Sequence, residues 1–306
     1  MTTKPDAYAL VTDSVLAMLD KGTLPWRKTW NGTTATTQAL SMSSGKPYSG
    51  INPFLLQCTA MEKGYTSRHW GTFKAIKAQG GSVRKGEKST VVVFWKWIKV
   101  EDEKTGTEKT IPFLRYFRVF NAEQAEWPEG MPEAFQPLPA GDQDDESFEP
   151  DAAAEAIVQG YIQGHQPPTL AHDGGDGAFY RPLTDGVHMP KAEAFGTPGE
   201  YYSTLFHELG HSTGAKGRLN RKGIVEFDAF GSHQYSQEEL VAEFTACFLC
   251  SDAGIVDTRP NSAAYIANWS RVLKNDRKLV VMAAAQAAKA ARMIRNGGRK
   301  DAPRED

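Results

Sequence analysis

The sequence predicts a mixed α/β protein of the α+β class with two domains, because of its length, its charge pattern and its hydrophobic periodicity. Its 306 residues are more than one average domain needs. Charge falls into three blocks: residues 1–122 carry 18 Lys and Arg against 9 Asp and Glu, residues 123–160 carry 11 acidic residues and no basic ones, and residues 161–306 carry 17 of each sign. Helical and strand-like periodicities occur together in the basic block, as is typical of an α+β domain.

The acidic block marks the boundary between the domains. It contains an acidic run at residues 142–146 and four prolines that break regular structure, Pro128, Pro132, Pro137 and Pro139. We therefore expect a first domain at residues 1–128, a linker at 129–149 and a second domain at 150–306.

The first domain is expected to combine helices with one long hairpin. Hydrophobic periodicity predicts helices at residues 6–20 and 53–63, and a third that begins at Trp70. Two strand-like runs follow, at residues 89–100 and 111–120, and the acidic segment between them forms the tip of a hairpin.

The second domain is expected to be mainly helical. Residues 151–163 and several segments after Thr197 have helical periodicity. Residues 185–190 are predicted to form a short edge strand that Pro190 ends. Such a strand could bind an extended peptide, and His188 would then line the cleft.

One motif in the second domain predicts a specific chemistry. His207-Glu208-Leu209-Gly210-His211 fits the pattern His-Glu-x-x-His, and Thr197-Pro198-Gly199-Glu200 predicts a helix start shortly before it. On a helix, His207 and His211 share a face and can present two nitrogens to one Zn²⁺. Glu208 can act as general base toward a water on the metal, whose pKa zinc lowers to about 7.

A peptidase site of this type needs a third protein ligand and an open fourth position. A helix expected at residues 236–249 supplies Glu239 and Glu243, which are one turn apart and share a face. Carboxylates on a core-facing helix need a partner, so we expect Glu239 to ligate the metal and Glu243 to orient a ligating histidine. The alternatives are the reverse assignment, a capping role with Ser236 for Glu239, and a solvated or structural carboxylate for Glu243.

Cysteine content and hydropathy indicate a cytoplasmic protein. The three cysteines form no disulfide framework, and Cys247 and Cys250 lie in an apolar helical run, where we expect buried core thiols. The sequence has no run of about 18 apolar residues and no signal peptide, so we expect no membrane partner.

Aromatic and basic residues interleave in the basic block, as around Trp26 and Trp70, and Arg84, Lys85 and Lys88 form a basic turn. Single-stranded DNA is held by such combinations, because Lys and Arg bind phosphates while rings stack on bases. A core role is the stronger interpretation for any single ring, but the positive charge of the whole block does not depend on one ring. We therefore expect the first domain to bind single-stranded DNA, with these five residues as candidate contacts.

The chain resembles ArdC-type antirestriction proteins of conjugative plasmids in both halves. The resemblance rests on residues 45–52, 80–88 and 117–124 in the first half, and on residues 201–211 and 238–243 in the second. It implies a single-stranded-DNA-binding domain, shared with the N-terminal part of some plasmid primases, followed by a zincin-like metallopeptidase domain of the gluzincin type.

The resemblance also implies that the protein protects incoming plasmid DNA from restriction in a recipient cell. It does not name a peptidase substrate, for which a component of a restriction system is the candidate partner. We expect Zn²⁺, or another divalent ion such as Mn²⁺, held by His207, His211 and Glu239. The competing interpretations are a non-enzymatic DNA-binding protein with a structural or vestigial metal site and, third, nucleic-acid processing by the metal domain.

Overall fold

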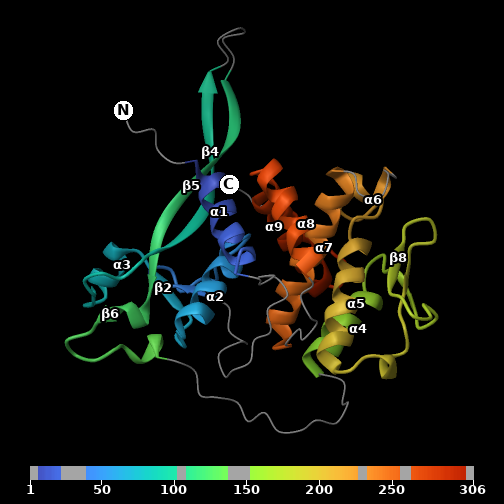
Figure 1. Ribbon diagram of the computed structural model, residues 1–306, viewed down its shortest axis with the longest axis horizontal. Coiled ribbons are helices and arrows are strands. Elements are labelled where there is room, and N and C mark those ends of the chain that lie inside the picture. The colour runs from blue at the N-terminus through green and yellow to red at the C-terminus, as the bar shows by residue number, and fades with distance from the viewer. Residues whose placement is uncertain are drawn as a thin grey trace. The chain divides into compact units, whose positions relative to one another are not determined.

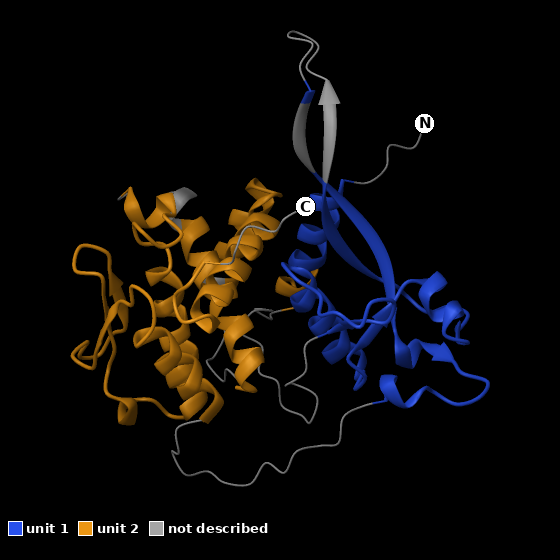
Figure 2. Ribbon diagram, turned by 180° about the vertical axis from the view of Figure 1, so that it is seen from behind, with its two compact units in different colours: residues 1–16, 39–138 blue, residues 17–38, 139–306 orange. Residues whose placement is uncertain are grey.

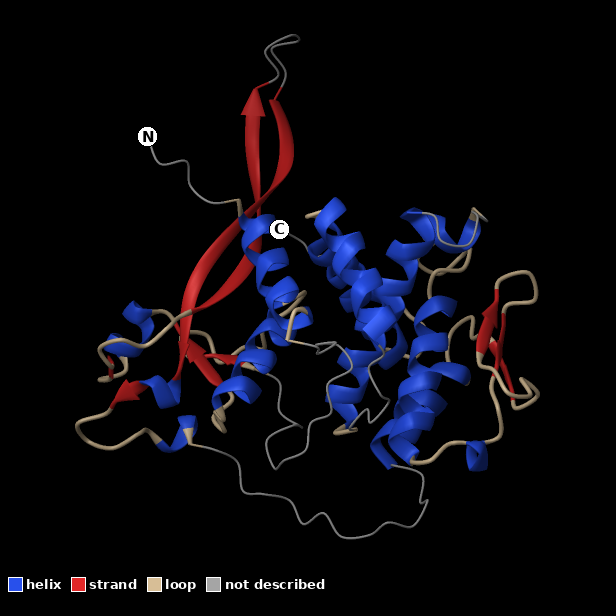
Figure 3. Ribbon diagram, viewed as in Figure 1, coloured by secondary structure: helices blue, strands red, loops and turns tan. Residues whose placement is uncertain are grey.

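The computed structural model describes residues 6–21, 39–101, 108–136, 152–226, 233–255 and 263–300. The chain divides into two compact units: unit 1 comprises residues 1–16 and 39–138, and unit 2 comprises residues 17–38 and 139–306 (Figure 2). The long strands belong to unit 1, whereas unit 2 is mainly helical (Figure 3). This mixture confirms the predicted α+β class.

Unit 1 contains a four-stranded sheet in the order β1-β2-β5-β4, in which β1 and β2 are parallel and the other neighbours are antiparallel. Strands β3 and β6 form a separate antiparallel pair. The elements in chain order are α1 (Ala7–Leu19, whose last residues are assigned to unit 2), β1 (Leu40–Ser41), α2 (Asn52–Lys63), β2 (His69–Gly71), α3 (Phe73–Ala78), β3 (Ser82–Val83), β4 (Thr90–Glu101), β5 (Glu108–Asn121) and β6 (Ala125–Glu126).

The predicted hairpin is confirmed. Strand β4 pairs with β5 along its whole length, from Thr90 opposite Val119 to Glu101 opposite Glu108 (Figure 1). The last two residues of β5 pair with β2. The helix expected from Trp70 begins later, because Trp70 lies in β2 and is buried. These pairings place alternate residues of both strands on one face of the sheet.

Buried side-chain amides fasten this sheet to its neighbours. Asn52, at the start of α2, donates to the Val93 carbonyl at 2.7 Å and accepts from the Val93 amide at 2.7 Å, so it closes the outer edge of β4 there. Asn121 donates to the Ser67 carbonyl at 2.7 Å, and the Gln124 side chain accepts from the Asn121 amide at 2.9 Å. Both asparagines fall within the segments that resemble ArdC-type proteins.

Unit 1 continues past the boundary expected at residue 128. Phe135, in the 3-10 helix Glu133–Phe135, is buried in a cluster with Met42 and Ile76. The packed part of the first unit therefore includes the first residues of the predicted linker. Residues 137–149 of that linker lie outside the described residues.

Unit 2 is built from helices around a hydrophobic core, with a small sheet of three short strands. Its elements are α4 (Ala152–Ile162), β7 (Thr169–Ala171), β8 (Phe179–Arg181), β9 (Gly186–His188), α5 (Pro198–Ser212), α6 (Lys222–Val225), α7 (His233–Ala253), α8 (Ala263–Asn275) and α9 (Leu279–Arg295). None of the helices within the described ranges has the length and hydrophobicity needed to cross a lipid bilayer.

The prediction of an edge strand at residues 185–190 was wrong. Strand β9 lies in the middle of its sheet, parallel to β7 and antiparallel to β8. The strand is only three residues long, so the sequence pattern alone could not show that strands at both sides would pair with it. An extended ligand can add to this sheet only at β7 or β8.

Helices α5 and α7 pack side by side, and this packing brings together the two motifs of unit 2 (Figure 1). Gly210 lies at the crossing: a Cβ there would be 3.1 Å from the Thr245 side chain and 3.3 Å from the Ala242 backbone. Gly210 therefore permits a close approach that a larger residue would prevent.

Candidate metal centre

Helix α5 begins where the sequence predicted. Thr197 caps it, with its side-chain oxygen accepting from the Glu200 amide at 3.2 Å. The Glu200 carboxylate accepts from the Gly196 amide at 3.0 Å, one residue before the position that a capping box would use. The helix then runs without interruption to Ser212, so His207 and His211 stand one turn apart on one face.

The three predicted ligands converge. The Nε2 atoms of His207 and His211 are 3.1 Å apart, and the carboxylate oxygens of Glu239 lie 3.6 Å from His207 Nε2 and 3.5 Å from His211 Nε2. Tetrahedral ligands at about 2.0–2.1 Å from Zn²⁺ are separated from one another by about 3.3 Å. The three side chains therefore have the mutual spacing that a divalent metal requires, and they are suited to hold such an ion.

Glu239 comes to the site from α7. The capping alternative for this residue is excluded, because α7 begins at His233 and Ser236 lies inside the helix. The Glu239 side chain is 26% exposed, against 13% for His207 and 10% for His211. The site is therefore most accessible on the Glu239 side.

The carboxylate that orients His211 is Glu238, not the predicted Glu243. Glu238 Oε1 lies 3.3 Å from His211 Nδ1. Arg221 donates a hydrogen bond to each carboxylate oxygen of Glu238, at 2.6 Å and 2.8 Å. Arg221 also donates to the Gly210 carbonyl at 2.9 Å, so it ties α5 to α7. Glu238 directly precedes Glu239 in the sequence, which places a second carboxylate near the ligands. Nothing in the sequence predicted that Arg221 would bind Glu238.

Burial and charge act in opposite directions on these groups. Burial lowers the pKa of His211, but the hydrogen bond to Glu238 and the charges of Glu239 and Glu208 outweigh it and raise this pKa to about 9. Burial raises the pKa of Glu238, yet Arg221 holds it below its usual range. Burial likewise raises the pKa of Glu239, and the two histidines bring it below its usual value. Both carboxylates are thus ionised at neutral pH, as metal ligation and histidine orientation require.

Glu208 and Glu243 complete the acidic surroundings of the site. Both are buried, and the charge of Glu243 raises the pKa of Glu239. Glu243 therefore lies close enough to affect Glu239, one turn away on α7. The role of Glu208 as general base remains a prediction at this point.

Three other histidines do not join this cluster. The ring of His172 forms a 2.8 Å hydrogen bond with the Tyr201 hydroxyl, and His188 Nδ1 lies 2.7 Å from the Asp173 carboxylate. His165 likewise stands outside the group of metal-ligating side chains found among the described residues. Cys247 and Cys250 are buried and are not joined in a disulfide, as expected.

The residues predicted to contact DNA differ in their exposure and in their partners. Trp70 is 1% exposed, so it cannot stack on a base in this fold, which corrects that prediction. Arg84 donates to the Glu87 carboxylate at 2.8 Å and to the Glu123 carbonyl at 2.6 Å, and so braces its own loop. Lys85 and Lys88 are exposed and available to phosphate, and Trp26 lies outside the described residues.

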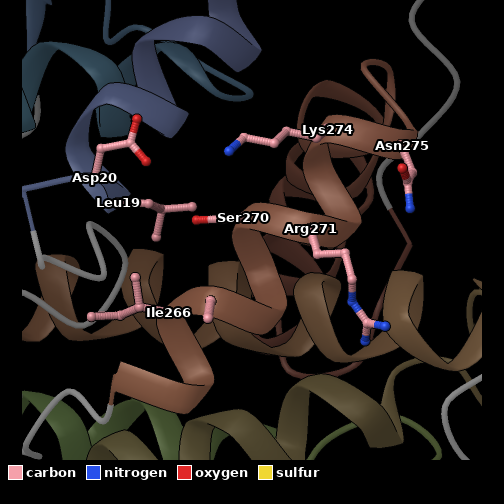
Figure 4. Close-up of a pocket in the computed structure, with 8 residues that line it drawn as sticks. Leu19, Asp20, Ile266, Ser270, Arg271, Lys274 and Asn275 are labelled. Atoms are coloured by element: carbon pink, nitrogen blue, oxygen red, sulfur yellow. The ribbon is translucent and has the colours of Figure 1, made fainter.

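A separate hollow of about 660 Å³ occurs in unit 2 (Figure 4). It contains none of the metal-centre residues, and its lining combines the end of α1 with one side of α8: Leu19, Asp20, Ile266, Ala267, Ser270, Arg271, Lys274 and Asn275. The lining holds no histidine or cysteine, so we assign no chemistry to it.

Similarity to known proteins agrees with this division into two parts. Residues 5–120 match the N-terminal domain of the anti-restriction factor ArdC, and residues 163–286 match a zincin-like metallopeptidase family. The metal-free crystal structure of the antirestriction protein ArdC from plasmid R388 has 36% sequence identity and a TM-score of 0.74, covering 96% of this chain and 98% of that one. The chain belongs to the ArdC antirestriction family.

Two further relatives extend the comparison. The uncharacterized protein y4eC of Sinorhizobium fredii is 34% identical over 296 residues, which are 93% of this chain and 90% of that protein. A DNA primase TraC of Escherichia coli is 34% identical over 304 residues, which are 94% of this chain but 27% of the primase.

A Mn(II)-bound structure of the R388 ArdC protein also matches, with 35% identity and a TM-score of 0.72. The zincin-like domain thus implies a divalent metal.

Proposed function

We propose that this member of the ArdC family is an antirestriction protein that binds single-stranded DNA through unit 1 and cleaves a protein substrate at the metal centre of unit 2. The observation that carries the enzymatic part is the convergence of His207, His211 and Glu239 at metal-ligand spacing next to Glu208. Three protein ligands leave a fourth position for water or substrate, whereas a structural zinc site normally has four.

The chemistry then follows from the side chains. A divalent ion held by His207, His211 and Glu239, Zn²⁺ or Mn²⁺, would polarise the scissile carbonyl and acidify a water. Glu208 would accept a proton from the attacking water and deliver it to the leaving nitrogen. Glu238, held by Arg221, accepts from His211 Nδ1–H and so keeps Nε2 free to ligate.

The substrate is proposed to be a component of the host restriction system. Binding of the incoming strand by unit 1 would bring the peptidase to the place where restriction occurs. The net positive charge of residues 1–122 supports the DNA-binding part, because phosphate contacts supply most of the non-specific affinity for DNA. This activity belongs in the cytoplasm of the cell that receives the plasmid.

The decisive experiment compares Glu208→Gln with the wild-type chain in an assay of plasmid protection against restriction. We expect Glu208→Gln to lose protection while keeping its metal content and its affinity for DNA, since Glu208 is not a ligand. Glu193→Gln, which removes an exposed carboxylate outside the cluster, is the matched control. Full protection by Glu208→Gln would establish the non-enzymatic interpretation instead.

A further inference from the structure

Beyond the buried Val92 and Val119, one face of the β4–β5 hairpin is open and carries an unusual set of side chains. Phe94 and Lys96 alternate on β4, and they stand opposite Arg115 and Phe113 of β5. Phe117 follows Arg115 on the same face, two residues further along β5. Aromatic and cationic side chains therefore alternate both along the strands and across them.

These rings are exposed to an extent that a core role does not explain. Phe94 is 42% exposed, Phe117 43% and Phe113 49%. Exposed faces of antiparallel sheets normally carry polar residues, and clustered exposed rings on a monomer mark a binding surface. Lys96 and Arg115 are exposed beside them, so the surface attracts an anion.

A pocket of about 370 Å³ lies on this face, at the lower end of the range of about 300–1,000 Å³ for small-ligand sites. Phe94 and Phe117 form one side of it and meet edge to face, with ring centroids 5.5 Å apart. Tyr48 lies across from Phe94, with centroids 6.2 Å apart. Burial raises the pKa of Tyr48 to about 12, so the phenol is neutral.

Apart from Gly71 and Val119, the rest of the lining is polar or cationic, and the lining includes no acidic residue. Ser41 and Ser43 contribute hydroxyls that lie 3.0 Å from one another. Lys96 of β4 and Arg115 of β5 also line the pocket. Hydroxyls can donate or accept, so they suit the edge of any base and would give little base preference.

We propose that this pocket holds one unpaired base of single-stranded DNA, stacked against Phe94 and Phe117, with the flanking phosphates on Lys96 and Arg115. The proposal rests on the proposed DNA binding by unit 1 and assigns it to a different surface from the basic turn around Lys85. A base within a duplex is stacked on its neighbours and cannot enter, so the pocket also accounts for a preference for single strands.

The test uses the full chain and two labelled strands of equal length, one of thymidines and one of abasic residues, followed by fluorescence anisotropy. Wild type should bind the thymidine strand more tightly, because only that strand has bases to stack. Phe94→Ala with Phe117→Ala should weaken thymidine binding about 5–150-fold, the loss that one stacked base represents, and leave abasic binding unchanged.

Trp95→Ala is the matched control, because Trp95 is 40% exposed and is the next residue on β4, on the opposite face. It should bind both strands as wild type does. Lys96→Gln with Arg115→Gln should weaken both strands alike and flatten the salt dependence by about 0.7 in log–log slope per lost phosphate contact.

The outcomes separate the pocket from DNA binding itself. If wild type binds neither strand, the proposed function of unit 1 fails together with the pocket. If wild type binds and the double Phe variant still prefers the thymidine strand as strongly, the pocket alone is overturned. Equal losses on both strands by the double Phe variant, with a lowered melting temperature, would also overturn it, because the rings would then be structural.

Discussion

The metal centre of unit 2 and the open sheet face of unit 1 hold their side chains in different ways. At the metal centre, His211 is fixed by Glu238, and Glu238 is fixed on both oxygens by Arg221. On the sheet face, Phe94 and Phe117 touch each other edge to face and are more than two-fifths exposed. A small ion needs donors held within fractions of an ångström, whereas a flexible strand adapts to its surface.

Because the two sites hold their side chains differently, we expect them to respond differently to mutation. Loss of one donor removes a large share of the metal-binding free energy, so the response is nearly all-or-none. Loss of one contact on an extended DNA surface removes one increment among several, so the response is graded.

Replacement of a ligating histidine should have the largest effect. His207→Ala should lose the bound metal at stoichiometric concentration, because two protein donors cannot retain a divalent ion against buffer. Its affinity for single-stranded DNA should equal that of wild type. Elemental analysis and anisotropy on the same preparation check both points, and metal occupancy equal to that of wild type would remove the site from α5.

The next prediction separates the two acidic neighbours on α7. Glu239→Ala should abolish metal binding at stoichiometric concentration, since Glu239 is the third donor. Glu243→Ala should weaken binding about 10–100-fold at most, as expected for a group outside the ligand set. Competition with a chelator of known affinity measures the difference, and a more severe loss in Glu243→Ala would reverse the assignment.

The metal centre was more predictable from the sequence than the DNA surface, and the reason is physical. The spacing of His207 and His211 is fixed by the helix itself, so a local pattern determines which atoms meet. Whether a ring is exposed depends on what packs against it. Trp70 and Phe94 look alike in the sequence, but Trp70 enters the core through β2 while Phe94 stays on the open face of β4.

Contacts between distant segments were the other limit of prediction. Arg221 and Glu238 are 17 residues apart and meet only because α5 and α7 pack closely at Gly210. The basic turn at Arg84 suggested a DNA contact by its charge. In the fold, Arg84 is engaged by Glu87, three residues further along the chain, and by the Glu123 carbonyl. The Glu123 carbonyl comes within reach of Arg84 only when β3 pairs with β6.

A moderate effect on stability is expected from the buried ion pair. Arg221→Met leaves Glu238 buried without its partner, which typically costs about 3–5 kcal/mol of unfolding free energy. Arg221→Met combined with Glu238→Leu removes both charges and should recover part of that loss, while the hydrogen bond from Arg221 to the Gly210 carbonyl stays lost. Its metal affinity should still be about 10–100-fold below that of wild type, because His211 is no longer oriented.

Chemical denaturation with and without metal distinguishes these two contributions. Recovered stability together with reduced metal affinity supports the role of Glu238 in orienting His211. Recovered stability with wild-type metal affinity would show that the pair only supports the fold.

The smallest effect concerns the basic turn of unit 1. Lys85 and Lys88 are exposed, and each can neutralise at most one phosphate. Lys85→Ala with Lys88→Ala should therefore reduce the log–log salt slope of single-strand binding by up to about 0.7 per lysine, equally for all sequences, and leave the melting temperature unchanged.

Arg84→Ala should behave in the opposite way, lowering the melting temperature of unit 1 with little change in salt slope, because its guanidinium is engaged within the loop. Titrations at several salt concentrations, paired with thermal melts, compare the two variants directly. An unchanged slope in the double lysine variant would show that the turn takes no part in DNA binding and would leave the open face of the hairpin as the proposed phosphate-binding surface.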